Sequence, residues 1–301
     1  MTRSLADIVR AFGVEPDAIR RVSHRQNTHW RVRAGADRYA LRRAGAWLDV
    51  KGDLEWELAV VEQWAAAGLP VARPLQPPRE IDGVKWVLMP WLAGRALGRA
   101  PWTDANYERL GALLADVHAA TALAPTPAQR PGWGSYADAA LPLVGGAARR
   151  AVLLAELARV GPEIAVRFEL AAEALEARNL PRIFAHSPRR TVHADFAPWN
   201  VRLRGGELSG LLDFELSHVD LPASDVAQAR RGYHDGVVRG YLRQGGRLSD
   251  AELANLDAFW LAAVLAGIWR ELEQRLARGP IAEVGFHWTL AQLDKIEPYR
   301  G

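Results

Sequence analysis

The sequence contains no cysteine, which excludes several kinds of protein chemistry at once. There can be no disulfide framework, no thiolate metal site and no cysteine nucleophile. This composition suits a reducing compartment, and we expect the protein to be cytoplasmic. Lysine is scarce as well, because Lys51, Lys85 and Lys295 are the only three in the chain. Nearly all of the positive charge is therefore carried by arginine.

Long apolar runs are also missing. No stretch approaches the roughly 18 uninterrupted apolar residues that a membrane span requires. The start of the chain sets Leu5, Ile8, Val9 and Phe12 at helical spacing among acids, unlike a signal peptide. The net charge of +3 is small for 301 residues, and pairs of basic residues are scattered along the sequence. We expect neither a membrane nor a nucleic-acid partner.

What remains is ordinary globular usage, with 49% hydrophobic and 24% charged residues in 301. That length is sufficient for two lobes, each with its own core. Three short β-like segments near the start predict an antiparallel sheet. They are residues 19–22, 28–33 and 38–42.

A helix is predicted over 54–67, because Gly68 and Pro70 end its pattern. Residues 81–89 then alternate around an Asp-Gly turn and end in a connector containing proline and glycine. We expect a hinge at about 89–94, with a first lobe over 1–92 and a second over 93–301.

The second lobe is predicted to be mainly helical, with long patterns over 107–120 and 147–179. One β-like island interrupts it, over 191–214, where a Gly-Gly turn joins two short strands. The predicted fold class is therefore α+β, with a sheet-containing first lobe and a helical second lobe that carries a β-hairpin.

This island places three polar residues at strand ends or turns. Asp195 follows His193 by two residues, Asn200 follows Asp195 by five, and Asp213 ends the last strand. Phosphoryl transfer to an alcohol needs a carboxylate to accept the hydroxyl proton and oxygen ligands for Mg²⁺. Two acids and an amide supply these groups, although each residue taken alone also suits a turn or a cap.

The island and its flanks resemble the aminoglycoside phosphotransferases, choline kinases and type II homoserine kinases, whose fold is similar to that of protein kinases. The stretches that carry the resemblance are Thr191-Val192-His193-Ala194-Asp195-Phe196-Ala197-Pro198-Trp199-Asn200, Gly210-Leu211-Leu212-Asp213-Phe214-Glu215 and Asp220-Leu221-Pro222-Ala223-Ser224-Asp225-Val226-Ala227.

The resemblance implies a bilobal, protein-kinase-like fold with ATP and Mg²⁺ as cofactors. It makes Asp195 the catalytic base and makes Asn200 and Asp213 the Mg²⁺ ligands. His193 would brace the loop, and Asp225 would be a structural helix cap. The acceptor would be a hydroxyl-bearing small molecule.

Arg42 stands where kinases of this fold carry a phosphate-binding lysine, and a planar guanidinium is not a compact ammonium. The resemblance pairs this cation with Glu57, while Glu55 is the neighbouring alternative. A solvated acidic helix face is the third possibility.

The segment from Ser23 to Thr28 occupies the place of the nucleotide-covering loop but contains no glycine. Ser23, Asn27 and Thr28 are candidate phosphate contacts, and an ordinary polar hairpin turn is the alternative. Met89 and Trp91, at the hinge, are candidates for backbone contacts to adenine.

The acceptor is left open among an aminoglycoside, choline, homoserine and other metabolites. One interpretation is that Trp260, Trp269 and Trp288 form an aromatic cage for a quaternary ammonium. The alternative is that Trp260 and Trp269 belong to an apolar helix face packed in the core. A nucleotide-binding pseudokinase that acts as an interaction module is the rival from another class, because the lysine and the loop glycines are missing.

Overall fold

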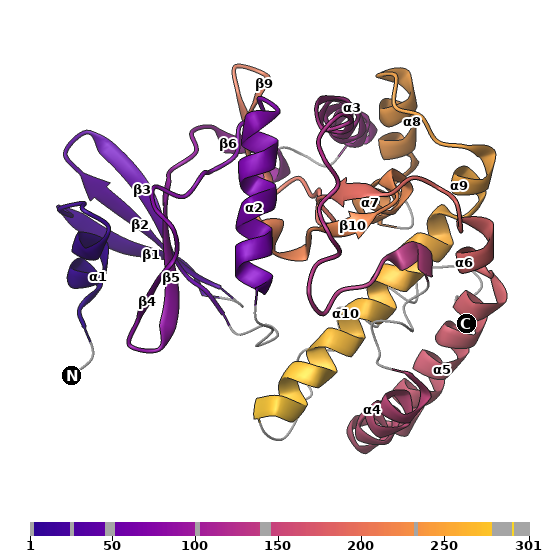
Figure 1. Ribbon diagram of the computed structural model, residues 1–301. Helices are drawn as coiled ribbons and strands as arrows, with labels where there is room; N and C mark the ends of the chain where they lie inside the picture. The colour runs from indigo at the N-terminus through magenta and orange to yellow at the C-terminus, as the bar shows by residue number, and fades with distance from the viewer. Residues whose placement is uncertain are drawn as a thin grey trace. The chain divides into compact units, whose positions relative to one another are not determined.

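The computed structural model describes residues 3–24, 27–45, 52–99, 103–138, 146–231, 234–278 and 291. Its contacts divide the chain into two compact units, each described by itself below (Figure 1). Unit 1 comprises Met1–Leu97 and Asn200–Leu212, and unit 2 comprises Gly98–Trp199 and Asp213–Gly301. Unit 1 carries an antiparallel sheet and unit 2 is mainly helical, so the predicted α+β class is confirmed.

Unit 1 is built on a five-stranded sheet whose strands are β1 (Ala18–His24), β2 (Thr28–Ala34), β3 (Asp37–Arg43), β4 (Arg79–Ile81) and β5 (Val84–Pro90). Their order is β1-β2-β3-β5-β4, and every neighbouring pair is antiparallel. Left-handed backbone at Gly35 and at Asp82-Gly83 makes the tight turns between paired strands. The strands predicted from the alternating pattern are confirmed.

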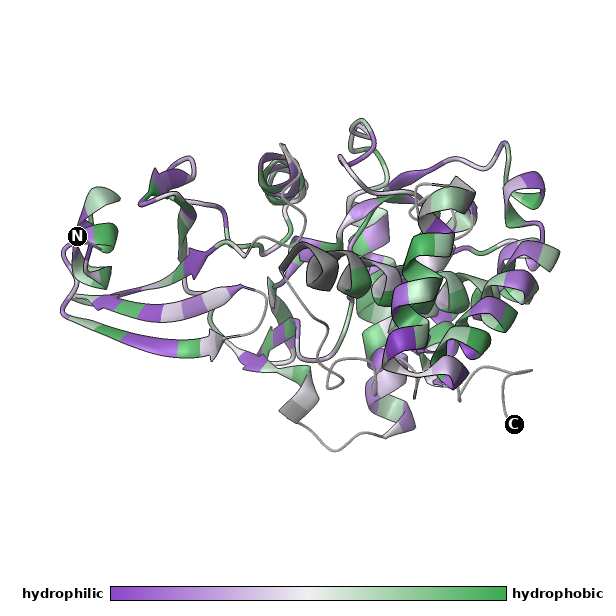
Figure 2. Cartoon of the chain, turned by 90° about the horizontal axis from the view of Figure 1, so that it is seen from below, coloured by the Kyte–Doolittle hydropathy of each residue, from purple (hydrophilic) through white to green (hydrophobic). Residues whose placement is uncertain are grey.

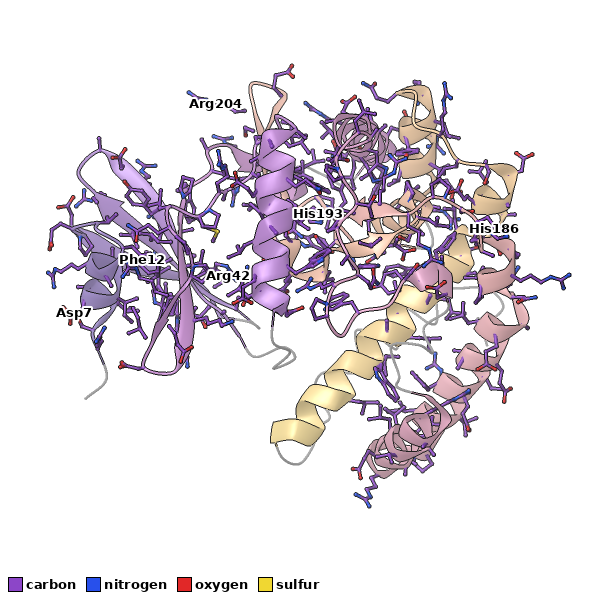
Figure 3. The ribbon with its side chains drawn as sticks, in the orientation of Figure 1. Asp7, Phe12, Arg42, His186, His193 and Arg204 are labelled. Carbon is purple, nitrogen blue, oxygen red and sulfur yellow. The ribbon has the colours of Figure 1, made fainter. Side chains whose placement is uncertain are left out.

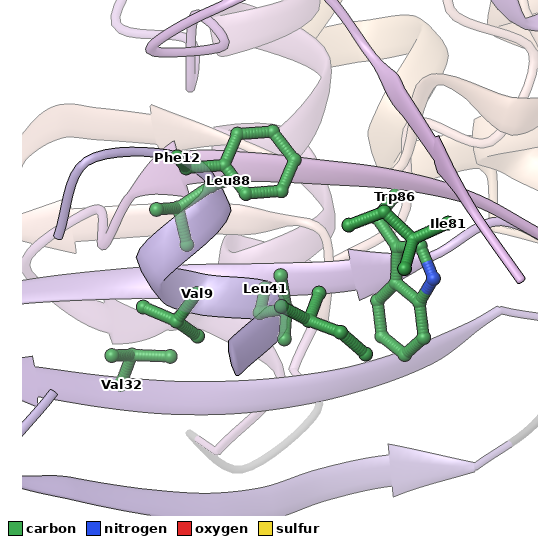
Figure 4. Packing of buried hydrophobic residues seen from close by; sticks show 8 residues of the cluster. Val9, Phe12, Val32, Leu41, Ile81, Trp86 and Leu88 are labelled. Atoms are coloured by element: carbon green, nitrogen blue, oxygen red, sulfur yellow. The ribbon is translucent and has the colours of Figure 1, made fainter. Parts of the chain in front are cut away.

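Helix α1 (Leu5–Ala11) covers one face of this sheet (Figure 1). Its apolar residues pack into a buried cluster with side chains from four strands (Figure 4), and the members are Ile8, Val9, Phe12, Val32, Leu41, Ile81, Trp86 and Leu88. Successive side chains of a strand point to opposite faces. The residues immediately before and after Val32 and Leu41 in their strands therefore point away from α1.

Helix α2 (Asp53–Ala66) lies on the other side of the sheet (Figure 1). It ends close to Gly68, whose φ of +82° interrupts helical geometry, as the sequence predicts. Arg42 of β3 points toward this helix (Figure 3), and this contact belongs to the candidate site.

A second, three-stranded sheet completes unit 1 and consists of β6 (Arg95–Ala96), β8 (Val201–Arg204) and β9 (Glu207–Leu211). Positive φ angles at Gly205 and Gly206 form the predicted two-residue turn. The Leu211 N–H donates to the Pro70 carbonyl at 2.9 Å. Through these pairings the hairpin packs with unit 1, whereas the sequence-based boundary placed everything after residue 92 in the second lobe.

Unit 2 contains the helices α3 (Asp104–Ala120), α4 (Gly146–Val160), α5 (Pro162–Ala177), α6 (Leu180–Ile183), α7 (Pro222–Arg230), α8 (Asp235–Arg243), α9 (Asp250–Ala254) and α10 (Leu256–Arg278). Hydrophobic and hydrophilic residues are mixed along them, as expected for helices with one buried face (Figure 2). No described helix combines the length and apolar character needed to cross a membrane.

Glycine brings α3 and α8 unusually close. A Cβ atom at Gly240 would lie 1.8 Å from the Glu108 carbonyl oxygen. In α10, Trp260 and Trp269 are only 4% and 1% exposed. These two tryptophans are therefore core residues rather than walls of an open aromatic cage, and Trp288 lies outside the described residues.

A short antiparallel pair, β7 (Arg190–Val192) and β10 (His218–Asp220), also belongs to unit 2. The buried carboxylate of Asp220 accepts hydrogen bonds from the hydroxyl of Ser135, at 2.6 Å, and from the N–H of Tyr136, at 2.6 Å. This anchors the 3₁₀ turn Tyr136–Asp138 beside the strand pair.

Candidate active site

Arg42 and Glu57 form a buried ion pair between β3 and α2. One guanidinium nitrogen of Arg42 lies 3.0 Å from one carboxylate oxygen of Glu57, and the second nitrogen contacts the other oxygen. The side chains are only 10% and 4% exposed. The two parallel contacts use the fork geometry of arginine. Glu55, the alternative, instead pairs with Lys85 at 2.5 Å on a more exposed part of the helix.

The residues of the expected nucleotide loop are tied to the protein itself. The Ser23 hydroxyl lies 3.0 Å from Nδ1 of His29. The Asn27 side-chain oxygen accepts the Gly45 N–H at 2.9 Å, and both Asn27 and Thr28 are buried. Arg25 and Gln26 lie outside the described residues. These contacts give the loop a structural role, and its contact with phosphate stays a prediction.

Burial, together with the nearby Arg42 cation, lowers the pKa of His29 from 6.5 to about 4. The unfolded chain therefore binds more protons than the folded chain between these pH values. Neutral His29 therefore contributes to the free energy of unfolding, and this contribution is fully present above pH 6.5 and is lost as the pH falls toward 4. We expect the free energy of unfolding to drop by about 3 kcal/mol over this window, as measured by denaturant titration.

A matched pair of variants isolates that effect. His29→Gln should remove most of the pH dependence between 6.5 and 4. His186→Gln should keep it, because His186 is exposed. An unchanged pH dependence in His29→Gln would contradict the assignment.

The hinge candidates lie at the end of β5. Met89 pairs with Ala40 of β3, and the Trp91 N–H donates to the Arg38 carbonyl at 2.9 Å. The amide of Trp91 is therefore already used within unit 1. A backbone contact from Trp91 to adenine would have to use its carbonyl, and the contacts of both hinge residues stay predictions.

The loop after β7 is held by Asp225. The N–H groups of His193 and Ala194 each donate to a different carboxylate oxygen of Asp225, both at 2.8 Å. Ala194 has a φ of +62°, an uncommon conformation for a residue with a Cβ, so these bonds stabilise a strained turn. The expected helix cap is wrong, because Leu221 is the N-cap of α7 and Asp225 reaches the loop instead.

A buried chain of hydrogen bonds supports Asp225. Burial alone would raise its pKa, but the hydrogen bonds and charges of His118 and His193 together outweigh burial and leave the pKa below its usual value. Nε2 of His118 lies 3.2 Å from Asp225, and Nδ1 lies 2.9 Å from the Tyr241 hydroxyl. Burial, and then the Asp225 charge, raise the pKa of Tyr241 to about 12. Sequence reasoning missed both partners, and its only signal was a histidine among the apolar residues of α3.

Asp195 is engaged by Arg231, which sequence reasoning also missed. A terminal nitrogen of Arg231 lies 3.1 Å from a carboxylate oxygen of Asp195. The guanidinium carbon lies 4.5 Å from the ring centroid of Trp199, a cation–π contact. Arg231 follows α7 with a φ of +54°. Asp225, near the start of α7, therefore fixes the backbone of the loop, and Arg231, just after the end of α7, fixes the Asp195 carboxylate.

Asn200 and Asp213 flank the hairpin of β8 and β9. The Asn200 carbonyl accepts the N–H of Leu212, the residue before Asp213, at 2.9 Å. Asp213 is left-handed, with φ +69° and ψ 66°, and the next residue, Phe214, packs on the ring of His193. His193 (Figure 3) therefore contacts Asp225 through its backbone N–H and the Asp213 segment through its ring.

The division of the chain assigns the three predicted reactive residues to different units. Asp195 and Asp213 belong to unit 2, and Asn200 belongs to unit 1. Asn200 and Asp213 offer an amide oxygen and a carboxylate, a donor set that suits a hard cation such as Mg²⁺. Among the described residues, no group of three or more His, Asp or Glu side chains is placed to hold a metal.

The family model of the phosphotransferase enzyme family matches residues 18–259. A homoserine kinase of Chelativorans sp. (strain BNC1) is 31% identical over 217 residues, which are 67% of this chain and 59% of that protein.

Two solved structures share the fold at low identity. An amicoumacin kinase in complex with AMP-PNP, Ca²⁺ and Ami has a TM-score of 0.66 at 15% identity, covering 98% of this chain and 94% of that one. A thermostable mutant of aminoglycoside phosphotransferase APH(4)-Ia, with ADP and hygromycin B, has a TM-score of 0.61 at 16% identity, covering 99% and 98%. The predicted kinase-like fold is thereby confirmed.

Proposed function

Because the chain belongs to the phosphotransferase enzyme family, we propose that it is a small-molecule kinase that transfers the γ-phosphoryl group of ATP to a hydroxyl. The observation that carries this proposal is the loop 193–195. A buried Asp225 holds its strained backbone, and Arg231 holds the carboxylate of Asp195. Such support fixes a reacting group in place rather than merely ending a strand.

In the proposed reaction, Asp195 orients the acceptor hydroxyl and accepts its proton. The acceptor oxygen forms a bond to the γ-phosphorus as the bond from that phosphorus to the bridging oxygen of ADP breaks. The products are a phosphorylated acceptor, ADP and a proton. Arg231 positions the carboxylate without reacting.

Asn200 and Asp213 would hold the metal ion through their side-chain oxygens. Mg²⁺, when bound, neutralises negative charge on the phosphate groups. The backbone hydrogen bond from Leu212 to Asn200 fixes the spacing of the two ends of the hairpin. Arg42, braced by Glu57, would contact the nucleotide phosphates in the role that lysine has in relatives with the same fold.

The ion pairs of unit 2 help to indicate which class of acceptor the protein binds. Glu108 pairs with Arg239 and Arg243, at 3.0 Å and 2.5 Å, and Arg230 pairs with both Asp235 and Asp257. Acids already paired with arginine are poorly suited to binding a polycation such as an aminoglycoside. With Trp260 and Trp269 buried in the core, a choline cage loses two of its candidate walls. A small amino alcohol without a quaternary ammonium is the favoured class, and the homoserine kinase relative makes homoserine the first compound to test.

A coupled assay of ADP release tests the proposal. The full chain would be incubated with ATP, Mg²⁺ and a panel of homoserine, other amino alcohols, choline, sugars and aminoglycosides, beside the Asp213→Ala variant. Acceptor-dependent ADP release that the variant loses is the expected result. Nucleotide binding without release for any compound would favour the rival, a pseudokinase that acts as an interaction module.

Replacing Arg231 by methionine should lower turnover about 10- to 100-fold with little change in nucleotide affinity, because the Asp195 carboxylate loses its positioning partner. The acid limb of the pH–rate profile should move to higher pH, since a cation next to a carboxylate favours the charged form. Arg230→Met is the matched control, because Arg230 pairs with Asp235 and Asp257 instead. Equal effects of the two variants on the pH profile would contradict this role.

A further inference from the structure

A buried arginine holds the backbone that follows Asp213. Arg130 is only 3% exposed, and one of its terminal nitrogens donates to the carbonyls of Glu215, at 2.9 Å, and Ser217, at 2.8 Å. Arg130 precedes these two residues by 85 and 87 positions, so no local pattern in the sequence indicates the contact. All four residues belong to unit 2.

Aromatic rings fix Arg130 in its place. Its guanidinium carbon lies 4.4 Å from the ring centroid of Trp133, a cation–π contact. Trp133 in turn stacks on the ring of His218, with centroids 5.6 Å apart and planes tilted by 25°. His218 is held by the buried carboxylate of Asp220, which lies 3.1 Å from its Nε2. The guanidinium is therefore part of a packed network and has one defined position against the backbone that it binds.

The backbone that Arg130 holds begins at a strained residue. Asp213 has left-handed angles, with φ +69° and ψ 66°, which are uncommon for a residue with a Cβ. Such a conformation persists only where the surroundings impose it. The 3₁₀ turn Phe214–Leu216 follows directly. Because Arg130 binds carbonyls within this turn and just after it, the contact restricts the backbone of Asp213 to this conformation.

The same segment is also tied to the loop that carries Asp195. The Ser217 hydroxyl donates to the carbonyl of His193 at 3.1 Å. Ser217 therefore accepts a hydrogen bond from Arg130 at its backbone and donates one to the loop from its side chain. A shift of this short segment would disturb the backbone of Asp213 and the loop at the same time.

The choice and the location of this cation distinguish positioning from general stabilisation. Taking a guanidinium out of water is costly, and a neutral donor would satisfy backbone carbonyls at a lower cost. A guanidinium is a rigid plane of N–H donors, so it holds both carbonyls in one fixed geometry. That geometry is imposed on Glu215 and Ser217, two and four residues after Asp213.

We propose that Arg130 is a positioning residue for the carboxylate of Asp213. The inference rests on the proposed function, in which Asn200 and Asp213 hold the metal ion. Arg130 acts through the backbone and contacts neither the metal nor the substrates. It keeps Asp213 in the conformation in which its carboxylate serves as a ligand. Replacing residues that orient a metal ligand typically costs about 10- to 100-fold in metal affinity or activity.

Equilibrium binding of AMP-PNP to the full chain, with Mn²⁺ and with a chelator, tests the proposal without turnover. We expect Mn²⁺ to strengthen AMP-PNP binding to the unmodified chain. Arg130→Met should lose most of this metal-dependent gain, while its metal-free affinity should stay within about twofold. Arg230→Met is the matched control, because Arg230 is also mostly buried, with a side chain 17% exposed, but pairs with Asp235 and Asp257. It should keep the gain.

The Mg²⁺ dependence of turnover separates positioning from a loss of stability. Arg130→Met should need at least about tenfold more Mg²⁺ for half-maximal turnover. A variant that is only less stable would lose turnover at every Mg²⁺ concentration and keep the same midpoint. Arg130→Lys retains a cation with several donors, so its midpoint should lie between the two. Arg130→Lys also supplies the measurement if Arg130→Met does not fold.

The Asp213→Ala variant makes failure of this inference distinguishable from failure of the proposed function. Asp213→Ala should lose the metal-dependent gain completely. A gain that is lost in Asp213→Ala but kept in both Arg130 variants would overturn the role of Arg130 alone, as would an equal loss in Arg230→Met. A gain that is kept in Asp213→Ala would contradict the proposed metal site and, with it, this inference.

Discussion

Replacing Asp195 by alanine is expected to reduce phosphoryl transfer by about 10²–10⁴-fold, the usual contribution of a positioned general base. The variant loses the carboxylate that orients the acceptor hydroxyl and takes its proton. Nucleotide affinity should change little, because Asp195 acts on the acceptor. Steady-state assays of product formation and equilibrium binding of AMP-PNP separate these two effects.

The structure offers a matched control for this prediction. Asp138 also pairs with an arginine of unit 2, Arg189, through two contacts. Asp138→Ala removes an arginine-paired carboxylate outside the loop 193–195 and should retain activity. If Asp195→Ala kept the rate of the unmodified chain, Asp195 would not be the base.

Replacing Glu57 by alanine is expected to destabilise the protein by about 3–5 kcal/mol, because it leaves the Arg42 cation buried without its partner. Denaturant unfolding monitored by circular dichroism measures the loss. The double variant Arg42→Met/Glu57→Leu should recover most of it, since apolar residues of similar volume often replace a buried ion pair at little cost. The same double variant should bind nucleotide poorly even though its stability is restored, because it lacks the Arg42 cation.

Glu55 on the same helix provides the comparison. Its ion pair with Lys85 is exposed, with side chains 52% and 41% accessible, so Glu55→Ala should cost less than about 1 kcal/mol. Similar losses in Glu55→Ala and Glu57→Ala would contradict the assignment of Glu57 as the partner of the phosphate-binding cation.

Local sequence signals predicted the strands and the main turns well. The Asp82-Gly83 and Gly205-Gly206 turns adopt positive φ angles, and Gly68 ends α2. These features depend on neighbours in sequence, so residue type and spacing are sufficient to predict them. The sequence did not indicate that the 200–212 hairpin belongs to unit 1. That assignment depends on pairing with Arg95 and Ala96 and on a contact with Pro70, which are far away in the chain.

In the candidate site, too, features set by neighbouring residues could be predicted and features set by distant residues could not. Asp195, Asn200 and Asp213 could be proposed from a short motif, whereas their support could not. Arg231 contacts Asp195 from 36 positions away, and His118 reaches Asp225 from 107 positions away. The choice between Glu55 and Glu57 likewise required the structure, because only the orientation of α2 decides which acid faces β3.

The most direct test of the central claim is to look for the phosphorylated product by mass spectrometry after incubation of the full chain with ATP, Mg²⁺ and the acceptor panel. The account predicts an acceptor heavier by one phosphoryl group, formed together with an equal amount of ADP and absent with Asp195→Ala. A chain that binds nucleotide but phosphorylates nothing in the panel, or a product formed equally well by Asp195→Ala, would contradict it.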